Sequence, residues 1–324
     1  MDRRFGGIKA VVLENDFVRL VVLADKGSDI VELVHKRKGV DVMWHSPLGH
    51  RPRSDSALLF PTSETGFLDG YGGGWQDLLP TIGSGPTDLH GAKFGLHGET
   101  GVLPWDATVE TSAEKAEAHF RVTGVRYPYS VEKTVALGLQ AEIQISEKLT
   151  NTSKQELEFY WLQHPAFGEP FLAPGCVLDL PKGSRVVNLE SINSRGRVAE
   201  GEFDWPHVKS KSGESIDLSV IPPKTVVAEE STFIRVKEGW YSFTNPALGL
   251  RVRFEWDTST FPWLWFWQNY WTPDYPFFGT AWNVAIEPAS SLPTTLEKES
   301  ARGAIVLGPG QSRTTRITVR LEEA

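Results

Sequence analysis

A strand-forming pattern is the feature that most constrains the fold of this chain. Short apolar runs alternate with turn-forming Gly, Pro, Asn, Asp and Ser residues, and no helical 3.6-residue periodicity extends over a dozen residues. The clearest run is LRVRFEWD at 250–257, in which apolar side chains alternate with charged ones. Residues 129–151 show similar alternation, typical of a half-buried antiparallel sheet. The pattern predicts an all-β antiparallel sandwich, formed as one domain over residues 1–324.

The most unusual stretch lies between Trp256 and Pro293. Its first part, WLWFWQNYW at 263–271, predicts a strand buried on both faces. Alternation places Trp263, Trp265 and Trp267 on one face, and we interpret this stripe as core. A second apolar strand, 282–286, is predicted to end with Glu287 before Pro288. A carboxylate at the end of a buried strand is costly unless it is hydrogen-bonded or used, so Glu287 is a candidate functional group.

Charge and composition exclude several classes of protein. The net charge of −8 and the pI near 5.6 argue against binding to nucleic acid or to an anionic membrane. No apolar run approaches the roughly 20 residues of a membrane span, and the N-terminus does not resemble a signal peptide. The single cysteine, Cys176, is consistent with a reducing compartment. We therefore predict a cytoplasmic protein. The oligomeric state is not indicated.

Residues 47–101 differ from the rest of the chain. They are rich in Gly, Pro, Ser and Asp and show almost no strand pattern, yet they contain several aromatic residues. A loop region of this length in a compact domain is usually functional or disordered, and the aromatic residues argue against disorder. We expect an ordered excursion that covers part of a site. Its GGG run at 72–74 lacks the Lys-Ser/Thr ending of a phosphate-binding loop.

Three polar groups lie where buried strands meet loops. They are His97 in GLHGETG, His164 in WLQHPAFG and Glu287 in NVAIEPASSLP. Two imidazoles and one carboxylate can move protons near neutral pH if the fold brings them together. Taken alone, His164 is also explained as a strand-end histidine bound by the backbone, and Glu287 as half of a buried ion pair. His90 lies seven residues before His97 and can be confused with it.

The motifs LHG at 96–98, HPAFG at 164–168 and IEP at 286–288 resemble those of the aldose 1-epimerase (galactose mutarotase-like) superfamily. The resemblance covers essentially the whole chain, in order. It implies an antiparallel β-supersandwich with an open sugar cleft. It also implies that Glu287 acts as base on the anomeric hydroxyl, that His164 acts as acid on the ring oxygen, and that His97 assists there. No metal or organic cofactor is implied, and the partner is a small sugar.

Two family features have no match here. Galactose mutarotases carry an Asn-Arg pair upstream of the first histidine, whereas residues 61–80 contain no Arg, and an aspartate that binds sugar hydroxyls has no counterpart. We expect the sugar to contact polar or aromatic residues near turns: Trp75, Gln76, Asp77, Gln268, Tyr270 and Trp271. An anionic sugar would need cations, for which residue type alone suggests Arg51, Arg53, Lys93 and Arg126.

Three other functions remain open. A glycoside hydrolase would need a second acidic group opposite Glu287, for which the sequence offers Glu64, Asp69, Asp77 and Glu99. A metal-dependent protein would need converging ligands, for which His90, His97, Glu99 and His164 are the candidates. A non-catalytic carbohydrate-binding protein would keep the aromatic cleft without needing Glu287.

Overall fold

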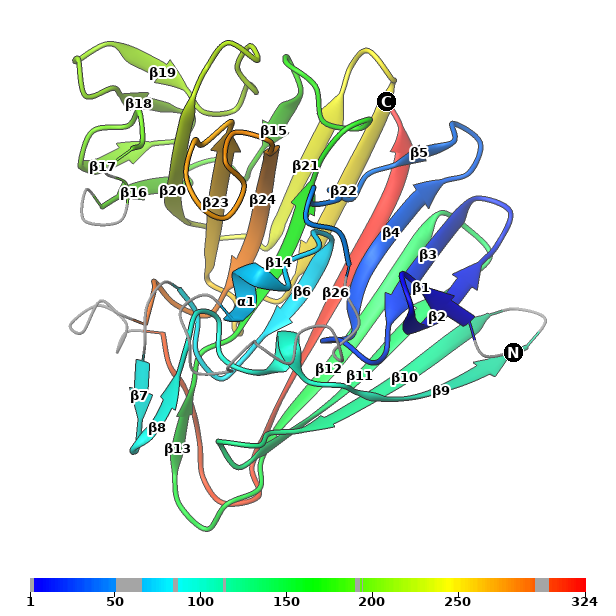
Figure 1. Ribbon diagram of the computed structural model, residues 1–324. Coiled ribbons are helices and arrows are strands. Elements are labelled where there is room, and N and C mark those ends of the chain that lie inside the picture. Colours follow the sequence, from blue (N-terminus) through cyan, green and yellow to red (C-terminus); the bar gives the residue numbers. More distant parts are fainter. Residues whose placement is uncertain are drawn as a thin grey trace.

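The computed structural model describes residues 3–50, 66–83, 87–112, 115–189, 193, 195–294 and 303–324. In these residues almost all regular structure is β-strand, and two large antiparallel sheets form the body of the molecule (Figure 1). Helix is confined there to the short α1 (Gly66–Asp69) and the 3-10 turn η1 (Thr100–Val102). The structure confirms the all-β prediction.

The larger sheet carries the candidate site. Twelve of the described strands form it, in the spatial order β1-β2-β3-β4-β6-β14-β24-β23-β20-β16-β17, with β5 paired to β4. The bounds of these strands are β1 (Arg3–Phe5), β2 (Ile8–Glu14), β3 (Val18–Leu23), β4 (Asp29–His35), β5 (Val40–Asp41), β6 (Trp75–Leu78), β14 (Leu162–Phe167), β16 (Arg185–Asn188), β17 (Gly201–Asp204), β20 (Ala228–Arg235), β23 (Trp263–Tyr270) and β24 (Trp282–Ala289).

The second sheet has eight described strands in the order β15-β21-β22-β26-β12-β11-β10-β9. Their bounds are β9 (Asp106–Thr111), β10 (Ala116–Thr123), β11 (Tyr129–Leu137), β12 (Glu142–Asn151), β15 (Val177–Asp179), β21 (Trp240–Asn245), β22 (Leu250–Trp256) and β26 (Ser312–Glu323). Three two-stranded pairs complete the set: β7 (Thr87–Leu89) with β8 (Ala92–Phe94), β13 (Leu157–Phe159) with β25 (Ile305–Leu307), and β18 (His207–Lys209) with β19 (Ser215–Asp217).

The core lies between the two sheets. Strand β22 buries every second side chain, as its alternation predicted. From the opposite sheet, Trp75 of β6 packs its ring 4.9 Å from that of Phe254. The same interior holds Lys133, which is fully buried and lies 3.8 Å from the carboxylates of both Asp77 and Glu147. Apolar burial and this buried charge cluster together join the sheets behind the candidate site.

Two local predictions were wrong. The Gly308-Pro309-Gly310 turn between two apolar runs predicts a C-terminal hairpin, but β25 pairs with β13 whereas β26 pairs with β12 and β22. The prolines after His164 and Glu287 predict that the strands end there, but β14 and β24 continue through them. The printed pairing of β14 with β24 joins Leu162 to Ala289 and Ala166 to Ala285 but no residues in between. The ladder is interrupted where both prolines lack an N–H, so the strands tolerate them.

In the described part of the chain, no helix has both the length and the apolar character needed to cross a membrane.

Candidate active site

Sheet register brings the candidate residues into one row. The pairs that flank them on β14 and β24 place His164 level with Glu287. Glu287 pairs with Trp265 on β23, and Trp265 pairs with Phe233 on β20. Because directly paired residues in an antiparallel sheet point to the same face, these four side chains lie side by side on the sheet. Residues far apart in sequence therefore meet because four strands are neighbours.

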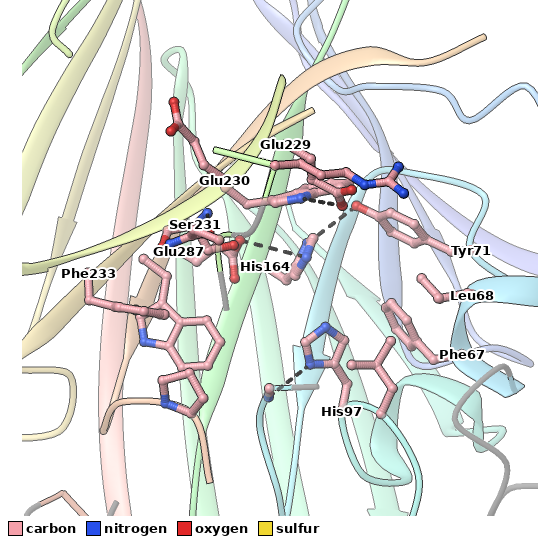
Figure 2. A pocket seen from close by; sticks show the side chains of 17 residues that line it. Phe67, Leu68, Tyr71, His97, His164, Glu229, Glu230, Ser231, Phe233 and Glu287 are labelled. Atoms are coloured by element: carbon pink, nitrogen blue, oxygen red, sulfur yellow. Dashed lines mark hydrogen bonds and ion pairs between the residues drawn. The ribbon is translucent and has the colours of Figure 1, made fainter. Parts of the chain in front are cut away.

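A cavity of about 360 Å³ opens over this row (Figure 2). Three groups of residues form its walls. The acid/base group is His97, His164 and Glu287, and the aromatic group is Phe67, Tyr71, Trp265 and Trp267. The remote polar group is Asn193, Arg195, Glu229 and Ser231. The volume is within the usual range for small-molecule pockets, roughly 300–1,000 Å³.

The His164 imidazole and the Glu287 carboxyl form the centre of the site. Nε2 of His164 lies 3.7 Å from Oε1 of Glu287, and both side chains are almost fully buried. Burial disfavours charge, so it raises the pKa of Glu287 well above its usual value and lowers the pKa of His164 to about 4. A proton that passes between them, or to a ligand placed between them, stays within the cavity. The pair can therefore act as acid and base on one small molecule.

His97 approaches from the loop on the other side of the pocket. Its ring centroid is 5.6 Å from that of His164, and its Nδ1 accepts a hydrogen bond of 3.3 Å from the Gly83 N–H. Burial and the nearby His164 lower the pKa of His97 well below its usual value. A neutral His97 whose Nδ1 accepts must carry its proton on Nε2. His97 is therefore a hydrogen-bond donor for an oxygen in the cavity.

The loop around His97 has an unusual backbone. His97 has φ +63° and Gly98 φ +73°, both in the left-handed region. A Cβ on Gly98 would lie 2.2 Å from the Leu79 carbonyl oxygen, so only glycine fits there. This close approach explains the glycine next to the histidine. It also supports His97, rather than His90, as the histidine of the site, since His90 stacks on Tyr127 instead.

The aromatic wall is formed by other residues than those expected. Trp265 and Trp267 line the cavity, although we interpreted the tryptophan stripe as core; Trp263 of the same stripe instead lies under the Arg235 guanidinium. Tyr71 and Phe67 come from the Gly-rich excursion, and their rings stack at 5.1 Å. The described parts of 47–101 thus contribute to the pocket, as expected; residues 51–65 and 84–86 are outside the described residues.

The remote end of the cavity is polar. Glu229 of β20 accepts a hydrogen bond from Trp267 Nε1 at 3.4 Å, and burial raises the pKa of its carboxyl. Arg195 forms an ion pair with Asp274. No sequence pattern singled out these residues, because a half-buried charge on a strand resembles an ordinary solvent-facing one.

Trp75, Gln76 and Asp77, predicted to contact substrate, are buried in β6 and are not among the residues that line the cavity. Trp75 donates its Nε1–H to Gln163 Oε1 at 2.7 Å on the core side, and Asp77 accepts from Trp161 Nε1. Gln76 donates to the Gly73 carbonyl oxygen. These three side chains do not reach the pocket, because they form hydrogen bonds and packing contacts inside the fold instead.

Gln268, Tyr270 and Trp271 are also missing from the cavity walls. Gln268 and Tyr270 alternate with Trp265 and Trp267 along β23 and so point to the opposite face. Gln268 accepts hydrogen bonds there from Arg197 and from the Tyr270 hydroxyl. Trp271 donates to the Lys224 carbonyl oxygen and stacks near Trp282. The polar residues chosen at the end of this strand therefore lie on the wrong face for the pocket.

The remaining candidates lie elsewhere. Arg51, Arg53 and Glu64 are outside the described residues, and Lys93 and Arg126 do not line the cavity. Of the acidic groups suggested for a hydrolase, Glu99 accepts hydrogen bonds from the backbone N–H groups of Val125 and Arg126, and Asp69 from the Tyr275 hydroxyl. Within the described ranges, the potential metal-ligand cluster is a different one, on the eight-stranded sheet: Glu110, Glu117 and His119.

Comparison with known proteins places the chain in a broader context. A family model described as "Domain of unknown function (DUF4432)" matches residues 6–321. None of the curated proteins matches the sequence.

Several solved structures share the fold. A Klebsiella pneumoniae protein, provisionally named as an aldose 1-epimerase, has a TM-score of 0.75 at 18% identity, over 99% of this chain and 82% of that one. A galactose mutarotase-like protein from Clostridium acetobutylicum has a TM-score of 0.71 at 14% identity, over 100% and 98%. An Escherichia coli protein, also provisionally named as an aldose 1-epimerase, has a TM-score of 0.68 at 16% identity, over 98% and 100%. These likenesses confirm the predicted galactose mutarotase-like β-sandwich fold.

Proposed function

For this chain, which belongs to the family described as a domain of unknown function (DUF4432), we propose the function of an aldose 1-epimerase that interconverts the α and β anomers of a hexose or hexose derivative. One observation carries the proposal. The imidazole of His164 and the carboxyl of Glu287 meet at 3.7 Å on the wall of a small-molecule cavity that also has aromatic faces. Aromatic rings suit the apolar C–H face of a sugar, and the pair suits proton transfer at its ring.

The proposed reaction needs one acid and one base on a single ring. Glu287 takes the proton of the anomeric hydroxyl while His164 gives a proton to the ring oxygen. The bond between C1 and the ring oxygen breaks, and C1 becomes an aldehyde. Rotation about the C1–C2 bond presents the other carbonyl face, and the reverse proton transfers close the ring as the other anomer. The Nε2–H of His97 donates a hydrogen bond near the ring oxygen.

The proton count of the buried pair suits this cycle. The shifted pKa values of Glu287 and His164 favour a neutral carboxylic acid beside a neutral imidazole in the empty pocket. The carboxylate–imidazolium form that starts the reaction contains the same number of protons. Hydrogen bonds from substrate hydroxyls stabilise the charged form, because they replace the water that burial removed. Binding therefore prepares the pair without uptake of a proton from solvent.

The cavity favours a neutral sugar. Arg195, the guanidinium on its wall, is paired with Asp274, while Arg197 is held by Glu230 behind the strand at 2.7 Å. Glu229 supplies an acceptor for hydroxyls at the remote end. The sugar-binding aspartate of galactose mutarotases has no sequence counterpart here, and we propose that Glu229, which lies between His164 and Glu287 in the chain, takes over this contact.

A glycoside hydrolase is less well supported. A hydrolase needs a second carboxyl group roughly 5–10 Å from Glu287, across the scissile bond. The other carboxylates on the wall are Glu229 and Glu230 of β20. Glu230 is paired with Arg197 at 2.7 Å, and Glu229 accepts from Trp267 Nε1 at 3.4 Å, so both already have partners.

Anomer-resolved NMR or polarimetry tests the proposal. Freshly dissolved single anomers of neutral and anionic hexoses are mixed with the protein, and the approach to anomeric equilibrium is timed. The wild type should accelerate at least one neutral sugar. Glu287→Gln should lose about 10²–10⁴ in turnover while sugar binding largely persists. The exposed Glu202→Gln is a matched control and should retain full activity.

Acceleration of none of the sugars would refute the epimerase. If a sugar nevertheless bound with equal affinity to wild type and to Glu287→Gln, the non-catalytic carbohydrate-binding alternative would take its place.

A further inference from the structure

The second ring nitrogen of His164 also has a partner. Nδ1 of His164 lies 3.3 Å from the hydroxyl of Tyr71, which comes from the segment after α1 and lines the cavity (Figure 2). Nε2 of the same ring faces Glu287. The imidazole is thus held between a phenol on one side and a carboxyl on the other. The acid/base roles of His164 and Glu287 do not by themselves require the phenol.

The position of the Tyr71 hydroxyl is set by packing. Its ring stacks on Phe67 at 5.1 Å and contacts Trp44 at 5.4 Å, and the side chain is almost fully buried. Rings from three directions therefore hold the phenol against the imidazole, Trp267 being the third at 6.4 Å. Burial and the nearby Glu287 raise the pKa of Tyr71, so its hydroxyl stays neutral and can accept a hydrogen bond as well as donate one.

A neutral imidazole carries its proton on only one of its two nitrogens, and the hydrogen bond at the other nitrogen decides which. A hydroxyl that accepts from an Nδ1–H leaves the lone pair of Nε2 facing Glu287 and the cavity. Nε2 can then take the proton of the Glu287 carboxyl and pass it to the ring oxygen, which returns His164 to the neutral Nδ1–H form. The opposite tautomer could give its Nε2 proton only by becoming an imidazolate. Resting on the proposed function, we propose that Tyr71 is a positioning residue that holds His164 in its Nδ1–H tautomer.

The two histidines of the site support this assignment by their contrast. Nδ1 of His97 accepts from the Gly83 backbone N–H, which can only donate and therefore keeps His97 neutral. Nδ1 of His164 faces a hydroxyl, which can accept from Nδ1–H both when the ring is neutral and when it is an imidazolium. A partner of this kind suits the histidine that changes its protonation state, and a backbone N–H suits the one that does not.

Tyr71→Phe tests the inference, because it removes the hydroxyl and keeps the ring. We expect kcat to fall roughly ten- to hundredfold, as when a buried donor loses its partner, with KM changed less than about twofold. Tyr241→Phe is the matched control: Tyr241 is equally buried but packs in the core against Phe254, so kcat should not change.

A second measurement reads the tautomer directly and requires no turnover. In protein labelled with ¹⁵N-histidine, the His164 signals, identified by their loss in His164→Asn, should show the Nδ1–H pattern. In Tyr71→Phe they should show a mixture of both tautomers. A purely structural role for Tyr71 would leave that pattern unchanged.

The outcomes separate the two proposals. If the wild type accelerates no sugar but shows the Nδ1–H pattern that Tyr71→Phe disturbs, the epimerase fails and the tautomer assignment stands. If the wild type is active but Tyr71→Phe retains both kcat and the ¹⁵N pattern, the inference about Tyr71 is overturned. A wild-type His164 in the Nε2–H form overturns it as well, and this result is available even if the variant does not fold.

Discussion

The protonation of His164 can be tested through the pH dependence of stability. Burial lowers the pKa of His164 to about 4, whereas a histidine in an unfolded chain titrates near 6.5. Between these two values the unfolded chain binds a proton that the folded chain does not. Stability is therefore lost as the pH falls through this window, and the loss is complete below about pH 4.

The size of the effect follows from the same two values. A difference of about 2.5 pKa units corresponds to about 3 kcal/mol over the whole window. Between pH 7 and pH 5 the loss is about 2 kcal/mol. His164→Asn removes this titration. The unfolding free energy of the wild type minus that of the variant should therefore decrease by about 2 kcal/mol from pH 7 to pH 5.

Urea unfolding followed by far-UV circular dichroism at pH 7, 6 and 5 measures this difference. Repeating the pair in a Glu287→Gln background removes the neighbouring carboxyl from the titration and makes the comparison specific to His164. The reasoning would be refuted if this free-energy difference increased in favour of the wild type as the pH falls. That result would mean that His164 is held as an imidazolium against Glu287.

Three further predictions test the core, the His97 loop and the aromatic wall. Lys133→Met should destabilise the fold by about 3–5 kcal/mol in urea unfolding, since it leaves the buried acidic pair Asp77 and Glu147 without its cation; an unchanged midpoint would contradict an ionic cluster. Gly98→Ala should lower the thermal unfolding temperature more than Gly183→Ala, because both glycines have positive φ but only the first variant places a Cβ against a backbone carbonyl. Equal decreases would mean that the backbone around residue 98 shifts to make room for the Cβ. Trp267→Ala should weaken sugar binding about tenfold in titration calorimetry while Trp263→Ala, outside the cavity, should not; similar effects would argue against an aromatic sugar platform.

The sequence predicted the architecture well because strand alternation is local. Leu250 to Trp256 bury alternate side chains as their pattern requires, and the Trp263–Tyr270 strand forms as expected. Local patterns do not state which strands become neighbours. The strand at Ile305–Leu307 is next to Ser312–Glu323 in sequence, yet the two have different partners in the fold.

The site was predicted in part for the same reason. His97, His164 and Glu287 stood out as polar groups at the borders of buried strands, in motifs with a family resemblance, and they line one cavity. The substrate-contact residues were chosen for polarity near turns. Polarity does not show whether a side chain forms hydrogen bonds within the core, as Asp77 does, or faces a pocket, as Glu229 does.

By itself, the sequence determined that strands form, which side chains share a face of each strand, and which polar groups are too costly to bury without a use. Only the tertiary structure decided which face borders the cavity and which strands lie side by side. That decision set Trp265 and Trp267 on the pocket wall and Gln268 behind it. The physical reason is that alternation relates neighbours along one strand, whereas a cavity is made by side chains from several strands and loops whose pairing depends on the packing of the whole fold.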